Sequence, residues 1–200
     1  MLDNASVRAR VSVVVEPLAR GLLRVGLKPD TVTWSGAIAV VLASIVLLPQ
    51  GHFLLGGIIF GVLGLSDLLD GTMARLTNKA GPWGAFLDST LDRVVDASVL
   101  GGVIAYYVVH PSPSWAVATG LIALVSAQLT SYIRARAESL DATCKVGIGE
   151  RFERSLILWI ALILQGLGIN ALPYALVVLA VMSVITVAQR IMHVRTQLLS

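Results

Sequence analysis

The chain has 200 residues, of which 56% are hydrophobic and 14% are charged, and its mean hydropathy is +0.82. Soluble domains contain roughly 45–50% apolar residues, so this composition excludes an ordinary soluble domain and indicates an integral membrane protein. The single cysteine, Cys144, excludes an internal disulfide and is typical of a reducing compartment.

Residues 1–28 are predicted to form a juxtamembrane amphipathic helix. Apolar residues recur from Val7 to Val25 at close to a 3.6-residue period, with arginines between them. Such a helix lies in the membrane surface, where arginines meet anionic headgroups; the alternative is a soluble lid packed on the ends of the membrane helices. Because charges interrupt every apolar core here, we expect the segment to be retained and not to be a secretory signal. Residues 29–200 then form the membrane domain.

Six apolar stretches follow, and a transmembrane helix needs about 20 such residues. The breaks at 49–52, 110–114 and 165–170 contain no charged residue, whereas all 15 basic residues lie at the opposite helix ends. Basic residues near helix ends are retained in the cytoplasm, so both termini are predicted to be cytoplasmic. The tryptophans lie near predicted helix ends, where interfacial aromatic residues are expected. The fold is predicted to be all-α, with spans at 31–48, 53–74, 85–109, 114–135, 155–168 and 171–192.

Two pairs of aspartates lie at the predicted cytoplasmic ends of consecutive helices. Asp67 and Asp70 are three residues apart and Asp88 and Asp92 four, so each pair shares one helix face. A carboxylate at bilayer depth costs roughly 2.5–3.5 kcal/mol, so four together need counter-charge. Nearby arginines are too few, whereas one or two divalent cations suffice, and oxygen ligands favour Mg²⁺ or Mn²⁺. The stretch therefore predicts a metal site and a substrate that carries phosphates.

Two sets of glycines surround these aspartates. Gly71 and Gly84 stand among them and carry no side chain that blocks a phosphate or base from the backbone, so we assign them to ligand binding. Gly57, Gly61 and Gly64 form a small-residue strip that we assign to helix packing.

The acidic stretch resembles the signature of the CDP-alcohol phosphotransferase family. With its spacers it is Asp67-x2-Asp70-Gly71-x2-Ala74-Arg75-x8-Gly84-x3-Asp88-x3-Asp92, and every fixed position matches. The resemblance implies a six-helix membrane enzyme, a homodimer with an interfacial N-terminal helix, in which an alcohol displaces CMP from a CDP-linked lipid.

The same resemblance implies roles for individual residues. Asp67, Asp70 and Asp88 would be the main metal ligands, and Asp92 would help to hold a second metal and act as the general base. The segment KPDTVT resembles the family's Pro-Asn-x-x-Thr turn, with Asp30 in place of the asparagine. The residues that this assigns to the CDP donor are Pro29, Thr33, Gly71, Ala74, Arg75 and Gly84.

Three basic clusters at cytoplasmic helix ends predict a phosphorylated acceptor. Each alone is explained by membrane orientation, but arginine suits phosphate because its fork donates two hydrogen bonds. The pattern resembles that of actinobacterial phosphatidylinositol phosphate synthases, although position 134 is more commonly lysine there. That likeness assigns the acceptor phosphate to Ser131, Arg134, Arg136, Arg154 and Arg190.

The resulting hypothesis is an enzyme of phospholipid biosynthesis in the cell membrane. It would transfer the phosphatidyl group of CDP-diacylglycerol to inositol phosphate on the cytoplasmic side, with two Mg²⁺ or Mn²⁺ ions. The nearest alternative is a phosphatidylglycerophosphate synthase that uses glycerol 3-phosphate; a cation transporter and a prenyltransferase are alternatives from other classes. Arg151 and Arg195 are interpreted as rim residues of the acceptor site, and Asp96 as a structural or supporting group.

Overall fold

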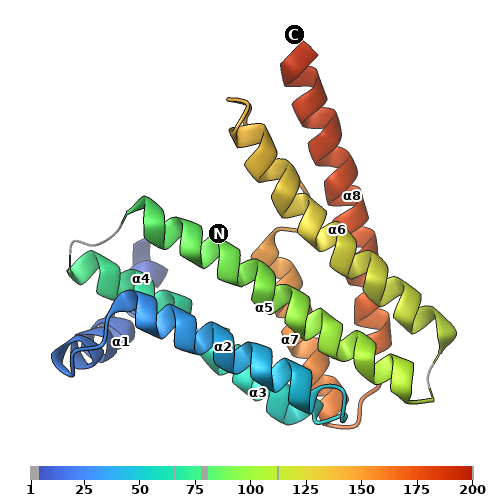
Figure 1. Ribbon diagram of the computed structural model, residues 1–200, viewed down its shortest axis with the longest axis horizontal. Coiled ribbons are helices and arrows are strands. Elements are labelled where there is room, and N and C mark those ends of the chain that lie inside the picture. Colours follow the sequence, from blue (N-terminus) through green and yellow to red (C-terminus); the bar gives the residue numbers. More distant parts are fainter. Residues whose placement is uncertain (1–4, 65, 78–80, 112, 200) are drawn as a thin grey trace. The chain divides into compact units, whose positions relative to one another are not determined.

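The computed structural model describes residues 5–64, 66–77, 81–111 and 113–199, with the side chains of 5–14 and 66–68 outside that description. Every regular element in these residues is a helix, which confirms the predicted all-α class (Figure 1). The helices are α1 (Ala5–Arg24), α2 (Pro29–Leu47), α3 (Phe53–Gly64), α4 (Ser66–Leu76), α5 (Pro82–Val109), α6 (Ser114–Glu138), α7 (Arg151–Gly166) and α8 (Leu172–Leu199).

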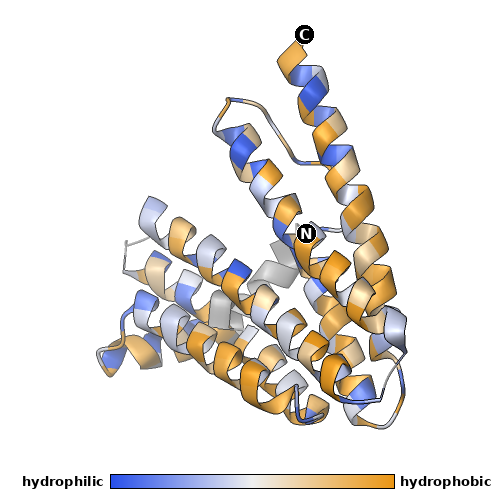
Figure 2. Ribbon diagram, turned by 45° about the vertical axis from the view of Figure 1, so that its right-hand side comes forward, coloured by the Kyte–Doolittle hydropathy of each residue, from blue (hydrophilic) through white to orange (hydrophobic). Residues whose placement is uncertain are grey.

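Five of the predicted spans each coincide with one helix, and the span at 53–74 coincides with α3 and α4. Hydrophobic residues make up much of these helices (Figure 2). Among the described residues, four segments are long and apolar enough to cross a membrane. Of the other two helices that coincide with predicted spans, α5 has 28 residues but carries several charged side chains, and α7 has only 16 residues. The count of six spans therefore stays a prediction. The four segments are Pro29–Leu47, Phe53–Leu76, Ser114–Glu138 and Leu172–Leu199.

Prolines fix where two of the helices begin. Pro29 opens α2 and Pro82 opens α5, a position that suits proline because the first helical N–H has no intrahelical partner. Gly26, at φ 83°, turns the chain between α1 and α2. Asp30 in the first turn of α2 is favourable at the positive end of the helix dipole. These two helix starts form part of the site described below.

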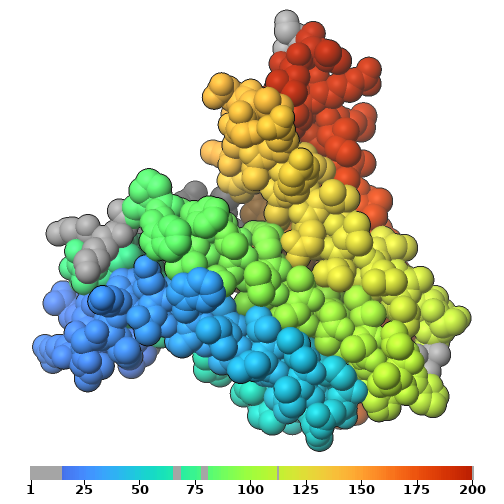
Figure 3. All heavy atoms as spheres, in the orientation of Figure 1, coloured from blue at the N-terminus to red at the C-terminus, as the bar shows by residue number. Residues whose placement is uncertain are grey.

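The chain divides into two compact units, residues 1–42 with 59–95, and residues 43–58 with 96–200. In the first unit α1 packs on α4. In the second unit α8 packs along α6 and also contacts α7, and α6 and α8 are neighbours in the space-filling view (Figure 3). The prediction that residues 1–28 and 29–200 are separate parts is a different division and stays a prediction.

Small residues allow close helix packing within the second unit. A Cβ added at Gly57 would lie 2.9 Å from Ile163 Cδ1, as expected for a packing glycine. Trp159 of α7 donates its indole N–H to the Gly57 carbonyl at 3.0 Å, which fixes the same contact. At Gly64, in contrast, an added Cβ would meet no described atom of this chain within 4 Å, so the packing interpretation has no support there.

Candidate active site

A cavity of about 450 Å³ lies in the first unit, among the start of α2, the middle of α4 and the start of α5. Most of the residues that the sequence assigned to the CDP donor line this cavity together with two of the predicted metal ligands. Its lining is Lys28, Pro29, Asp30, Thr33, Asp70, Gly71, Ala74, Gly81, Gly84, Ala85, Leu87 and Asp88.

Asp70 is the buried carboxylate of this cavity, with 8% of its surface exposed. The Thr33 hydroxyl on α2 donates to Asp70 Oδ2 at 2.5 Å, and it also lies 3.2 Å from the Pro29 carbonyl oxygen. This hydrogen bond fixes the orientation of the carboxylate, whose oxygens can each accept more than one partner. The turn from Pro29 to Thr33 therefore positions Asp70, an aspartate of the acidic signature.

Asp88 is exposed and lines the same cavity, and the negative charges of Asp70 and Asp88 repel each other. Such a pair favours a cation between its oxygens, and hard oxygen ligands suit Mg²⁺ or Mn²⁺. A Cβ added at Gly71 or Gly84 would meet no atom that the structure describes within 4 Å, so these glycines leave space beside the carboxylates. The residues present thus fit a divalent cation with a phosphate ligand.

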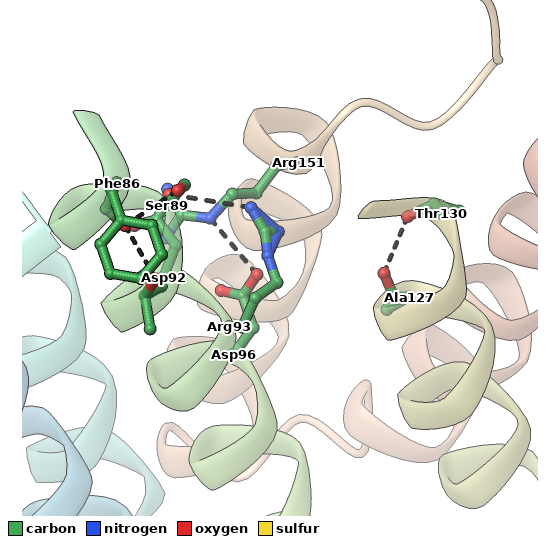
Figure 4. A network of polar contacts seen from close by, with 9 residues as sticks. Phe86, Ser89, Asp92, Arg93, Asp96, Ala127, Thr130 and Arg151 are labelled. Carbon is green, nitrogen blue, oxygen red and sulfur yellow. Dashed lines mark hydrogen bonds and ion pairs between the residues drawn. The ribbon is translucent and has the colours of Figure 1, made fainter. Parts of the chain in front are cut away.

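The other two predicted metal ligands are Asp67 and Asp92. Asp67 belongs to α4, but its side chain lies outside the described residues. Asp92 follows Asp88 by one turn of α5 and is largely buried, with Arg93 Nη2 at 4.0 Å from its Oδ2 (Figure 4). No group of three potential ligands is found among the side chains that the structure describes. The four-aspartate metal set therefore stays a prediction.

Arg75 does not line the cavity, although the sequence assigned it to the donor. Its Nε donates to the Gly71 carbonyl at 3.2 Å and its Nη2 to the Thr72 hydroxyl at 3.0 Å. The guanidinium therefore folds back along its own helix.

Lys28 and Asp30 line the cavity without having been assigned to it. Asp30 accepts a hydrogen bond from the indole N–H of Trp83 at 3.0 Å. Both residues adjoin Pro29, so their place in the KPDTVT turn was the available signal. The Trp83 contact had no signal in the sequence beyond the expectation of an interfacial aromatic residue.

Two of the predicted acceptor arginines are buried in the second unit. Arg154 on α7 donates to the Gly149 carbonyl, and Arg190 on α8 donates to the Val146 and Thr130 carbonyls. The connection between α6 and α7 is also bound by α8, because the Gly149 N–H donates to the Thr186 hydroxyl at 3.1 Å. Both arginines thus meet the same ordered connection.

The other three predicted acceptor residues lie on α6. Ser131 is half-buried and directly follows Thr130, whose carbonyl accepts from Arg190. Arg134 is exposed and pairs with Glu138 at 2.9 Å, and Arg136 is exposed and contacts the Ser139 hydroxyl at 3.3 Å. Their convergence with the buried arginines on one phosphate stays a prediction.

Asp96 and Arg151 form an ion pair between α5 and α7 within the second unit. Arg151 Nε lies 3.3 Å from Asp96 Oδ2, and both side chains are partly buried (Figure 4). Asp96 therefore ties two helices together, and the guanidinium of Arg151 is engaged by this contact.

Comparisons with known proteins show the family of the chain. Residues 27–192 match the family model for CDP-alcohol phosphatidyltransferase. The chain is 41% identical over 197 residues to the phosphatidylinositol phosphate synthase of Cutibacterium acnes, covering 94% of this chain and 95% of that one. It is 40% identical over 202 residues to the Streptomyces avermitilis enzyme of the same name, covering 97% of this chain and 83% of that one.

Solved structures give the same result. The phosphatidylinositol phosphate synthase of Mycobacterium tuberculosis with CDP-DAG bound has a TM-score of 0.86 at 38% identity, covering 90% of this chain and 93% of that one. The same enzyme in complex with manganese and citrate has a TM-score of 0.88 at 38% identity, covering 92% and 90%. This chain therefore belongs to the CDP-alcohol phosphatidyltransferase family.

Proposed function

We propose that this chain is a phosphatidylinositol phosphate synthase, which transfers the phosphatidyl group of CDP-diacylglycerol to inositol phosphate and releases CMP. The observation that carries the proposal is the cavity in which Thr33, Asp70 and Asp88 stand beside open glycine backbone. The choice of acceptor is supported by relatives of that name, which align over nearly the whole chain at about 40% identity.

Asp67, Asp70, Asp88 and Asp92 would hold one or two Mg²⁺ or Mn²⁺ ions. Bound metal would neutralise the diphosphate of the donor and the negative charge that develops on the leaving CMP. A solved relative contains manganese, and the carboxylate oxygens of the cavity are ligands of the type that both ions prefer.

The chain's own residues would prepare the donor for attack. Thr33 orients Asp70, while Gly71 and Gly84 admit the nucleotide to the backbone. Asp92 would accept the proton of the acceptor hydroxyl. The acceptor oxygen then attacks the phosphorus that bears diacylglycerol, the bond from that phosphorus to the CMP oxygen breaks, and its electron pair leaves with CMP.

The second unit would bind the acceptor through its phosphate. Arginine forks suit this group because they donate paired hydrogen bonds, and Arg154 and Arg190 are already oriented by backbone carbonyls. The residues that we assign to the acceptor phosphate are Ser131, Arg134, Arg136, Arg154 and Arg190.

The enzyme would work at the cytoplasmic face of the cell membrane, as a homodimer of six-span chains with α1 in the membrane surface. The uncharged turns on one side and the 15 basic residues on the other support this orientation. Four segments of the described chain have the length and apolarity that spanning requires.

Purified protein incubated with CDP-diacylglycerol, Mg²⁺ and one acceptor at a time tests the proposal. We expect CMP release with inositol phosphate and little with glycerol 3-phosphate. Turnover with glycerol 3-phosphate but not with inositol phosphate would overturn the choice of acceptor and favour a phosphatidylglycerophosphate synthase.

A further inference from the structure

The first turn of α2 is connected to two other helices by side-chain hydrogen bonds. Thr33 donates to Asp70 of α4, and Asp30 accepts from Trp83 of α5 at 3.0 Å between Oδ2 and Nε1. The cavity lies among these same three helices, and Asp30, Thr33 and Asp70 all line it. The two hydrogen bonds therefore join the walls of the cavity.

Trp83 itself does not line the cavity. It is 60% exposed and lies beside Phe86, with ring centroids 5.9 Å apart. A tryptophan needs only its position at the headgroup level to act as an interfacial anchor. The directed contact with a carboxylate of the cavity is additional to that role, because an indole N–H is a donor only and Asp30 is the acceptor it meets.

The Trp83 N–H holds the Asp30 carboxylate in one orientation at the start of α2. Its carboxylate accepts hydrogen bonds only, so it suits an N–H or O–H group of the nucleotide. A group that is already oriented pays less entropy when the ligand binds. The Trp83 contact would orient Asp30 and fix the spacing of α2 and α5 before the donor arrives.

We propose that Trp83 is a positioning residue for the nucleotide end of the donor, acting through Asp30. The proposal rests on the proposed function, since it takes the cavity to be the site of a CDP group. It assigns to Trp83 a role in donor affinity that is separate from the chemical step and from binding of the acceptor.

A double-mutant cycle of Trp83→Phe and Asp30→Ala tests this role. We expect Trp83→Phe to raise the KM for CDP-diacylglycerol and the Kd of CDP about two- to tenfold, the usual value of one hydrogen bond, with the acceptor KM unchanged. Asp30→Ala should raise both quantities as well. In the Asp30→Ala background, Trp83→Phe should have no further effect.

Trp34→Phe is the matched control, because Trp34 is an exposed tryptophan of α2, 46% exposed, outside the cavity lining. It should leave the Kd of CDP unchanged. The proposal is overturned if Trp83→Phe leaves CDP affinity unchanged, or weakens it equally with and without Asp30, as an anchor would.

Two further measurements keep the outcome interpretable. Should Trp83→Phe fail to fold, Asp30→Ala keeps the indole ring in place, and unchanged CDP affinity in that variant overturns the proposal. The Kd of CDP, measured by calorimetry on the full chain in detergent with Mg²⁺, does not depend on the acceptor. Suppose that the cycle shows coupling between Trp83 and Asp30 in CDP binding, but the wild-type protein does not use inositol phosphate. That result would contradict only the proposed function.

Discussion

The Thr33 hydroxyl on α2 donates a hydrogen bond to the Asp70 carboxylate on α4, across 37 residues of sequence. This contact joins the KPDTVT turn to the acidic signature, and the family resemblance assigned Thr33 to the CDP donor and Asp70 to metal. The orientation of a predicted metal ligand therefore depends on a residue of the donor turn.

Replacing Thr33 by valine removes this hydrogen bond and keeps the side-chain shape. Loss of a group that orients a metal ligand typically costs about 10–100-fold in metal affinity or activity, so we expect Thr33→Val to need more Mg²⁺ for half-maximal turnover. Activity titrated against Mg²⁺ measures this. Thr33→Ser keeps the hydroxyl and should follow the wild type, and a Thr33→Val titration that overlies the wild type would contradict the role.

Gly71→Ala should impair donor binding without harm to the fold. Among the described residues, the added Cβ meets nothing within 4 Å, and alanine favours a helix by up to about 1 kcal/mol over glycine. We therefore expect an unchanged or higher Tm together with a raised KM for CDP-diacylglycerol.

Gly102→Ala is the matched control, because Gly102 also lies inside a helix, α5. Its Cβ would meet the Ser44 backbone carbonyl and Leu48, and overpacking of this kind costs about 1–3 kcal/mol. Its Tm should fall. A Gly71→Ala variant with a lowered Tm and an unchanged KM would show that Gly71 serves packing instead.

Asp92→Asn removes the proposed general base and keeps its size. General base catalysis contributes about 10²–10⁴-fold, so we expect kcat to fall by that range. Asp96→Asn, one turn further along α5, alters a carboxylate that pairs with Arg151 and should keep most of kcat. Near-normal turnover by Asp92→Asn would refute the assignment of the base.

Arg154→Gln should raise the KM for inositol phosphate about tenfold or more, because a hydrogen bond to a charged group is worth about 1.5–3 kcal/mol. Since Arg154 also holds the Gly149 carbonyl, Thr186→Val is the control: it removes another bond to the same connection and leaves every arginine in place. If Arg154→Gln and Thr186→Val raise the KM for inositol phosphate equally, Arg154 acts only by holding the connection between α6 and α7.

The sequence predicted the helices, and the clustering of signature residues that line one cavity, for clear physical reasons. Long apolar stretches placed the helices, and i, i+3 and i, i+4 spacings placed aspartates on shared helix faces. Asp70 and Asp88 do line one cavity with Gly71 and Gly84. Such local patterns are visible in a sequence because they depend on helix geometry alone.

Other features depend on tertiary packing and could not be predicted. The Asp30 and Trp83 contact joins residues 53 positions apart, and nothing in either segment indicates the other. Arg75 binds the backbone of its own helix, a contact that the sequence did not indicate, and its assignment to the donor stays a prediction. The carbonyl contacts of Arg154 and Arg190 depend on how the connection between α6 and α7 lies against α8.

The most direct test of the account follows the phosphorus of the donor. CDP-diacylglycerol carrying a radioactive label at the phosphorus next to diacylglycerol is incubated with the protein, inositol phosphate and Mg²⁺, and the lipid and water-soluble products are separated. We predict that the label appears in phosphatidylinositol phosphate, that unlabelled CMP is released in equal amount, and that EDTA abolishes both. Label that appears in phosphatidic acid or in a nucleotide would contradict the account. Label that stays in CDP-diacylglycerol, with no CMP released, would also contradict it.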